Sequence, residues 1–90
     1  MLMNEVSVSP EVRAKLPDML VEYLWRLALD AKYRECPVQT FVLEPVTLSG
    51  QEIQNISHLD EERRVFGLAP VTCKLCVLSS GNGYRMMLGE

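Results

Sequence analysis

The stretch from Pro17 to Arg34 constrains the fold of this 90-residue chain more than any other. Pro17 suits the first position of a helix, where no N–H is needed, and Asp18 complements the positive end of the helix. Cys36-Pro37 would stop the helix, because a residue before proline avoids helical dihedrals. Apolar side chains recur between these points at spacings of three and four, which places them on one helix face: Leu20, Tyr23, Leu24, Leu27 and Ala31. The pattern predicts a helix over residues 17–34.

A second apolar stripe lies part of the way round the same predicted helix and consists of Val21, Trp25 and Leu29. A wide stripe is typical of a helix that lies on a sheet, so burial in the core is the first interpretation. The second interpretation is a ridge that binds a protein partner. Exposure of the Trp25 ring would favour the ridge, and complete burial would favour the core.

Short strands and turns account for most of the remaining sequence. Alternating or β-branched segments predict four strands, over residues 38–44, 52–58, 71–77 and 84–88. Residues 3–8 predict a further short edge strand, and Ser9-Pro10 predicts the start of a single helical turn over residues 10–15. The whole pattern predicts one α+β domain over residues 1–90, with one main helix packed on a mostly antiparallel sheet of about four strands.

Three local features modify the predicted sheet. Pro45 cannot donate to a central ladder, so the strand before it ends there, bulges or lies at an edge. Ile53 and Ile56 are three residues apart, which predicts a bulge near Gln54-Asn55. Residues 59–64 are charged and predict a connection rather than a strand.

Charge and cysteine content limit the classes of function that the chain could have. The net charge is −3, and the one adjacent basic pair, Arg63-Arg64, directly follows three acids. We therefore expect no direct binding to nucleic acid, which needs a concentrated positive patch. The chain shows neither a signal peptide nor an apolar run long enough to span a membrane. Three cysteines without an export signal predict reduced thiols and a soluble, cytoplasmic protein.

The reactive residue types do not form a recognisable catalytic or metal motif. Cys73 and Cys76 form a C-x-x-C pair, but within a strand their side chains point to opposite faces, so we interpret them as structural. His58, the only histidine, lacks an accompanying nucleophile, so we expect it to donate to a backbone carbonyl or to Glu61. Asp60, Glu61 and Glu62 lack the turn glycine of a cation site and are interpreted as a solvated segment.

Several short motifs spread over most of the chain carry a family resemblance. They are Val12-x-x-x-Leu16-Pro17, Leu24-Trp25-x-Leu27, Val38-Gln39-x-Phe41-x-Leu43, Ile56-x-His58-x-x-Glu61, Cys73-Lys74-Leu75-Cys76-Val77-Leu78 and Met86-Met87-Leu88. Together they resemble the bacterial domain of unknown function 960 family, small proteins of Gram-positive bacteria and their mobile elements. Asp60 stands where that family usually has glutamine, and Ser79-Ser80-Gly81 replaces an acidic turn. The resemblance implies an α+β fold and an unassigned role, and it carries over no catalytic residue.

These observations predict a small non-enzymatic protein-interaction module without a metal or cofactor. The alternative is an accessory or inhibitory protein of a mobile element that blocks a nucleic-acid enzyme through an acidic face. The candidate partner-binding residues are Val21, Trp25, Leu29, His58, Asp60, Glu61 and Glu62. A homodimer through an exposed edge strand, residues 3–8 or 38–44, is left open.

Overall fold

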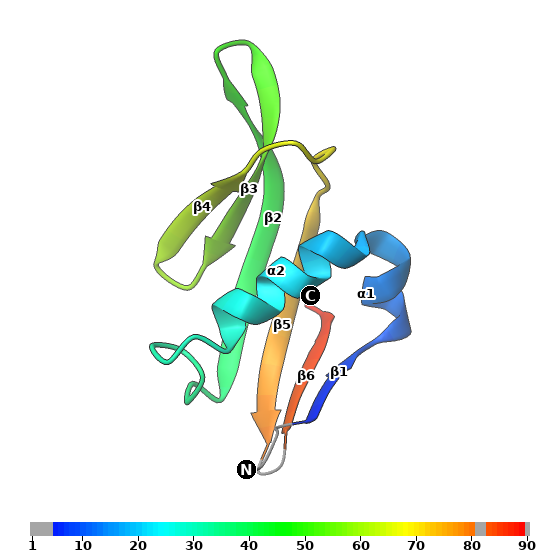
Figure 1. Ribbon diagram of the computed structural model, residues 1–90, viewed down its shortest axis with the longest axis vertical. Helices are drawn as coiled ribbons and strands as arrows, with labels where there is room; N and C mark the ends of the chain where they lie inside the picture. Colours follow the sequence, from blue (N-terminus) through cyan, green and yellow to red (C-terminus); the bar gives the residue numbers. More distant parts are fainter. Residues whose placement is uncertain (1–4, 81–82, 90) are drawn as a thin grey trace.

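One six-stranded sheet with two short helices makes up the computed structural model, which describes residues 5–80 and 83–89 (Figure 1). In chain order the elements are β1 (Glu5–Val8), α1 (Pro10–Lys15), α2 (Asp18–Ala28), β2 (Val38–Leu48), β3 (Gln51–His58), β4 (Glu61–Val65), β5 (Cys73–Ser80) and β6 (Gly83–Leu88). The strand order is β1-β6-β5-β2-β3-β4. All neighbouring pairs are antiparallel except β1 and β6, which come from opposite ends of the sequence and run parallel.

The predicted fold class is wrong. An α+β fold with one main helix on about four strands was expected, whereas the structure is mostly sheet, with six strands in one mixed sheet and two short helices. Figure 1 shows α2 crossing one face of the sheet while α1 lies beside β6 and β1. The prediction counted too few strands, because β1 was treated as marginal and the segment that forms β4 was not recognised.

The first helical turn was predicted correctly, whereas Pro17, predicted as the first position of the main helix, is its extended N-cap, and the predicted end of that helix is wrong. Ser9 caps α1 by accepting from the N–H of Val12 at 3.4 Å, and the extended Leu16-Pro17 segment separates α1 from α2. The helix expected over 17–34 ends at Ala28, and turns occupy the next residues. There the Asp30 carboxylate accepts from the N–H of Lys32 at 2.9 Å, a local bond that competes with a helical one.

The core lies between α2 and the face of the sheet that α2 crosses. Directly opposite residues on neighbouring strands share a face, so the ladder places Phe41 and Leu43 beside His58, Ile56 and Leu75. The buried apolar residues of this layer come mainly from both helices and four strands, and they include Val12, Leu16, Leu20, Leu24, Phe41, Leu43, Ile56, Leu75, Val77 and Met86. The predictions that Phe41 and Leu43 face the helix, and that Leu20, Leu24 and Leu27 are buried, are confirmed.

The hairpin of β2 and β3 shows how Pro45 and the two isoleucines are accommodated. β2 continues through Pro45 as far as Leu48, but β5 pairs with it only as far as Leu43, so β2 is locally an edge at the proline. The predicted bulge near Gln54-Asn55 is wrong, since the register with β2 and with β4 is uninterrupted. Ile56 lies in the core and Ile53 on the opposite face, which explains their odd spacing.

The expectation that residues 59–64 form a charged connection is wrong, because residues 61–64 belong to strand β4. It pairs antiparallel with β3 from His58↔Glu61 to Gln54↔Val65. Its first four residues are two acids followed by two bases, with no apolar alternation, so period-two hydrophobicity could not reveal it. The true sheet edges are β1 and β4, which means that residues 38–44, offered as a possible edge, lie in an interior strand.

Candidate functional site

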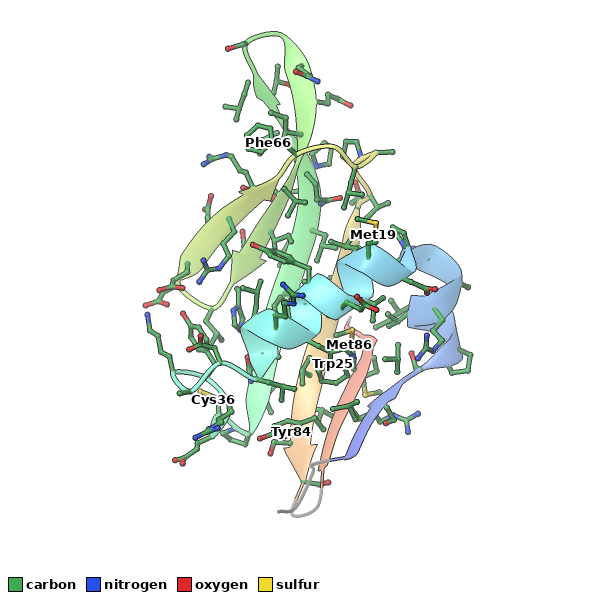
Figure 2. All side chains as sticks on the ribbon, in the orientation of Figure 1. Met19, Trp25, Cys36, Phe66, Tyr84 and Met86 are labelled. Atoms are coloured by element: carbon green, nitrogen blue, oxygen red, sulfur yellow. The ribbon has the colours of Figure 1, made fainter. Side chains whose placement is uncertain are left out.

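The three residues of the predicted helix ridge are buried to different degrees, and Leu29 lies just beyond the end of α2. Val21 is buried in the core, while Trp25 and Leu29 are half-buried. Val21 and Trp25 line a hollow of about 280 Å³ together with Val6 and Val8 of β1. Figure 2 shows Trp25 on the side of α2 that lies over β6 and β1. The half-buried ring meets neither criterion, full exposure or full burial, so the ridge stays a prediction.

His58 is completely buried between two aromatic rings. Its ring stacks on Phe41 with centroids 4.2 Å apart and lies 4.3 Å from the tilted ring of Tyr33. Burial lowers its pKa, and the positive charge of Arg63 lowers it further. The environment therefore disfavours the charged form of the imidazole.

Gln39 determines which nitrogen of His58 carries the proton. Its amide nitrogen donates to the carbonyl oxygens of Ala28 at 2.9 Å and Tyr33 at 3.0 Å, so its oxygen is left as an acceptor. His58 Nε2 lies 2.7 Å from that oxygen, which assigns the proton to Nε2. His58 Nδ1 has no hydrogen-bond partner within the described ranges. The expected partner was a backbone carbonyl or Glu61, and the observed partner is a buried side-chain amide.

The acidic run is divided between the two faces of the sheet. Glu61 lies on the helix side, where it accepts from Lys32 Nζ at 2.5 Å and from Arg63 at 2.9 Å. The hydrogen bond from Lys32 is the main reason that the pKa of Glu61 falls to about 2. Glu62 points to the opposite face, and Asp60 lies in the exposed turn before β4. The three carboxylates do not converge on one point.

The two cysteines of the C-x-x-C pair point to opposite faces, as predicted. Cys73 is opposite Leu43 and packs in the core, whereas Cys76 is opposite Thr40 on the other face and is half-buried. Burial raises the pKa of the Cys73 thiol. Among the described residues, no group of three or more histidine, cysteine or acidic side chains is placed to hold a metal ion.

A groove that the sequence did not reveal runs between α2 and the segment after β4. Its volume is about 290 Å³, and its apolar lining comprises Met19, Tyr23, Val65, Phe66 and Leu68. Met19 and Phe66 are each 69% exposed, so they offer large apolar surface to solvent. In Figure 2 both labels lie on the side of α2 away from Trp25. Met19 falls outside both predicted helix stripes, and only its isolated apolar side chain could have signalled the site.

A buried glutamine of β3 bonds to the chain just beyond the outer wall of this groove. Gln54 accepts from the N–H of Val71 at 2.7 Å and donates to the carbonyl of Val71 at 3.2 Å. This pair of bonds ties the segment between β4 and β5 to the sheet. On the facing wall, Glu22 and Arg26 of α2 supply one charge of each sign. The charged residues that line the groove thus carry no net charge.

Comparison with known proteins supports the fold alone. No protein-family model matches the chain, and no curated protein matches it. The chain is similar to a solved crystal structure of a protein of unknown function from Enterococcus faecalis, with a TM-score of 0.60 and 15% sequence identity. The likeness covers 94% of this chain and 87% of that chain. In the part of the chain that the structure describes, neither helix is long and apolar enough to cross a membrane.

Proposed function

We propose that the chain is a non-enzymatic protein-interaction module that binds an apolar peptide segment of a protein partner in the groove beside α2. The observation that carries the proposal is the groove itself, with two large apolar side chains, Met19 and Phe66, exposed on its walls. Surface patches of this kind commonly mark binding sites. A volume of about 290 Å³ suits one or two large apolar side chains of such a segment.

The chemistry of the remaining candidates supports a role without catalysis. His58 is enclosed by aromatic rings and bonded to Gln39, and Cys73 is buried with a raised thiol pKa. A nucleophile needs the opposite environment, because exposure and a lowered pKa make a thiol reactive. We also propose a cytoplasmic setting, since all three cysteines are unbonded.

The alternative function, an inhibitor that blocks a nucleic-acid enzyme through an acidic face, stays a prediction, as does the resemblance to the domain of unknown function 960 family. The acidic run gives the inhibitor little support. Glu61 is already paired with two cations of this chain, and Glu62 faces the other side of the sheet.

Selection from a random peptide library on the immobilised chain tests the proposed groove. We expect the selected peptides to be rich in large apolar residues and to shift the NMR signals of Met19 and Leu68. The variant Met19→Asp/Phe66→Asp should lose at least about tenfold in affinity, equivalent to about 1.4 kcal/mol. It should keep its fold, because both side chains are exposed.

Leu48→Asp is the matched control, since Leu48 is an exposed apolar residue at the far end of the β2–β3 hairpin. The control should bind selected peptides like the unmodified chain. If no peptide is selected, or if the groove variant binds as well as the control, the groove is not the docking site.

A further inference from the structure

β4 is an edge strand whose outer side is open. It ends the strand order, and Figure 1 shows it at the outside of the sheet. Within residues 5–80 and 83–89, its backbone makes hydrogen bonds to β3 and to no other element. An edge of this kind presents a row of free N–H and C=O groups, which is a template for pairing with another strand.

The side chains of β4 carry opposite charges in a fixed order. Glu61 and Arg63 lie on the helix side and bind each other at 2.9 Å. Glu62 and Arg64 lie on the other face, are exposed, and belong to no ion pair of the described chain. The exposed face of this edge therefore holds one acid and one base, two positions apart, that are not used within the chain.

This order is self-complementary for an antiparallel strand. Two identical antiparallel strands can be related by a two-fold axis. Because hydrogen-bonded and non-hydrogen-bonded pairs alternate along the ladder, this axis must pass between one residue and the same residue of the second copy. An axis at Arg63 places Glu62 opposite Arg64 of a second copy, and the symmetry repeats this pair. The two Arg63 side chains meet at the axis, but each already binds its own Glu61.

Exposed apolar residues also lie at the two ends of β4. Phe66 follows the strand and is 69% exposed, while Leu59 precedes it and is 46% exposed. Antiparallel pairing about Arg63 brings Phe66 of one copy next to the turn that holds Leu59 of the other. In this register Phe66 is opposite Asp60 of the second copy, and Leu59 is the next residue along that turn.

We propose that two copies of the chain associate along β4 into one continuous sheet, with Glu62 of each copy opposite Arg64 of the other. The occupant of the open edge is a second copy because the charge order complements itself. The association is weak and salt-dependent, since it rests on a single short strand and exposed charges. It shares Phe66 with the proposed peptide groove, but Glu62 and Arg64, whose charges carry the proposal, do not line that groove.

Sedimentation velocity over a range of protein concentrations tests the proposal. The unmodified chain should show a monomer–dimer equilibrium that weakens as salt is added. Glu62→Arg and Arg64→Glu each place like charges opposite one another, and each should weaken the dimer at least about tenfold. Both positions are exposed, so the variants should fold, as circular dichroism would verify.

A charge exchange makes the test specific. An equimolar mixture of Glu62→Arg and Arg64→Glu chains should dimerise again, because one copy then carries two arginines and the other two glutamates. The double variant Glu62→Arg/Arg64→Glu should likewise dimerise on its own. Glu52→Arg and Lys74→Glu are controls that change exposed charges on β3 and β5, and they should leave the dimer intact.

Three outcomes would overturn the proposal. They are an unmodified chain that stays monomeric at every concentration, a dimer that tolerates both single variants, and a mixture no more associated than its components. Peptide binding by the groove could persist in any of these cases, so the two proposals fail separately.

Discussion

His58 links the buried core to the acid sensitivity of the protein. It is the only histidine of the chain, and its ring is fully buried against Phe41. Burial lowers its pKa below the ordinary value of 6.5, with Arg63 adding to the effect. The unfolded chain takes up a proton near pH 6.5, whereas the folded chain resists it to a lower pH.

We expect the free energy of unfolding to be independent of His58 above pH 6.5 and to fall as the pH drops from 6.5 towards the folded pKa. The direction follows because the unfolded state binds more protons in this window. One histidine can contribute at most about 1.4 kcal/mol per pH unit. Urea unfolding at a series of pH values measures this slope.

His58→Gln supplies the control for this slope, because it removes the only side chain that ordinarily titrates near pH 6.5. The slope just below pH 6.5 should disappear in this variant. A direct NMR titration of the His58 ring checks the same point in the unmodified chain, and a pKa at or above 6.5 would contradict the interpretation.

At the scale of elements, the end of α2 depends on a residue of the next strand. Gln39 lies on β2, eleven positions beyond Ala28, yet it accepts from His58 and donates to the carbonyls of Ala28 and Tyr33. A helix leaves its last carbonyls without intrahelical partners. The buried amide provides one of these partners and also fastens the following turns to the sheet.

Gln39→Leu should destabilise the protein by at least about 2 kcal/mol, because each buried polar group left without a partner costs about 1–3 kcal/mol. Urea unfolding measures the loss. Gln51→Leu is the matched control, since Gln51 is exposed at the start of β3 and should change stability by no more than about 0.5 kcal/mol. Equal effects of the two substitutions would show that the Gln39 contacts do not stabilise the fold.

At the scale of the whole molecule, the sheet has two unlike faces. The helices and the core lie on one face, which contains Cys73, whereas Cys76 lies on the other. Exposed apolar residues occur on that second face too, where Val38 is directly opposite Leu78. The rates at which Cys73 and Cys76 react with a thiol reagent therefore show which face of the sheet the reagent can reach.

A thiol reagent applied to the native protein should modify Cys76 and the half-buried Cys36 at least about tenfold faster than Cys73. Cys73 is buried, and its raised pKa leaves less of the reactive thiolate. Mass spectrometry of peptides taken over time measures the three rates. The difference should vanish in urea, and equal rates in the folded protein would contradict this arrangement of the faces.

The sequence alone identified features whose causes are local. Ser9-Pro10 and Pro17 predicted where the helical segments begin and separate, because capping and proline geometry act within a few residues. Alternation predicted the buried faces of β2 and β5, including Phe41, Leu43 and Leu75. It also placed Cys73 and Cys76 on opposite sides of their strand.

Tertiary structure decided the features that depend on distant residues. Gln39 bonds to the carbonyl at the end of α2, and Gln54 bonds to the segment before β5. β4 is a strand because β3 supplies its hydrogen bonds, although its charged sequence has no apolar alternation. The parallel pairing of β1 with β6 joins the two ends of the chain. Local periodicity carries no information about such partners, because their bonds form only once the sheet has brought them together.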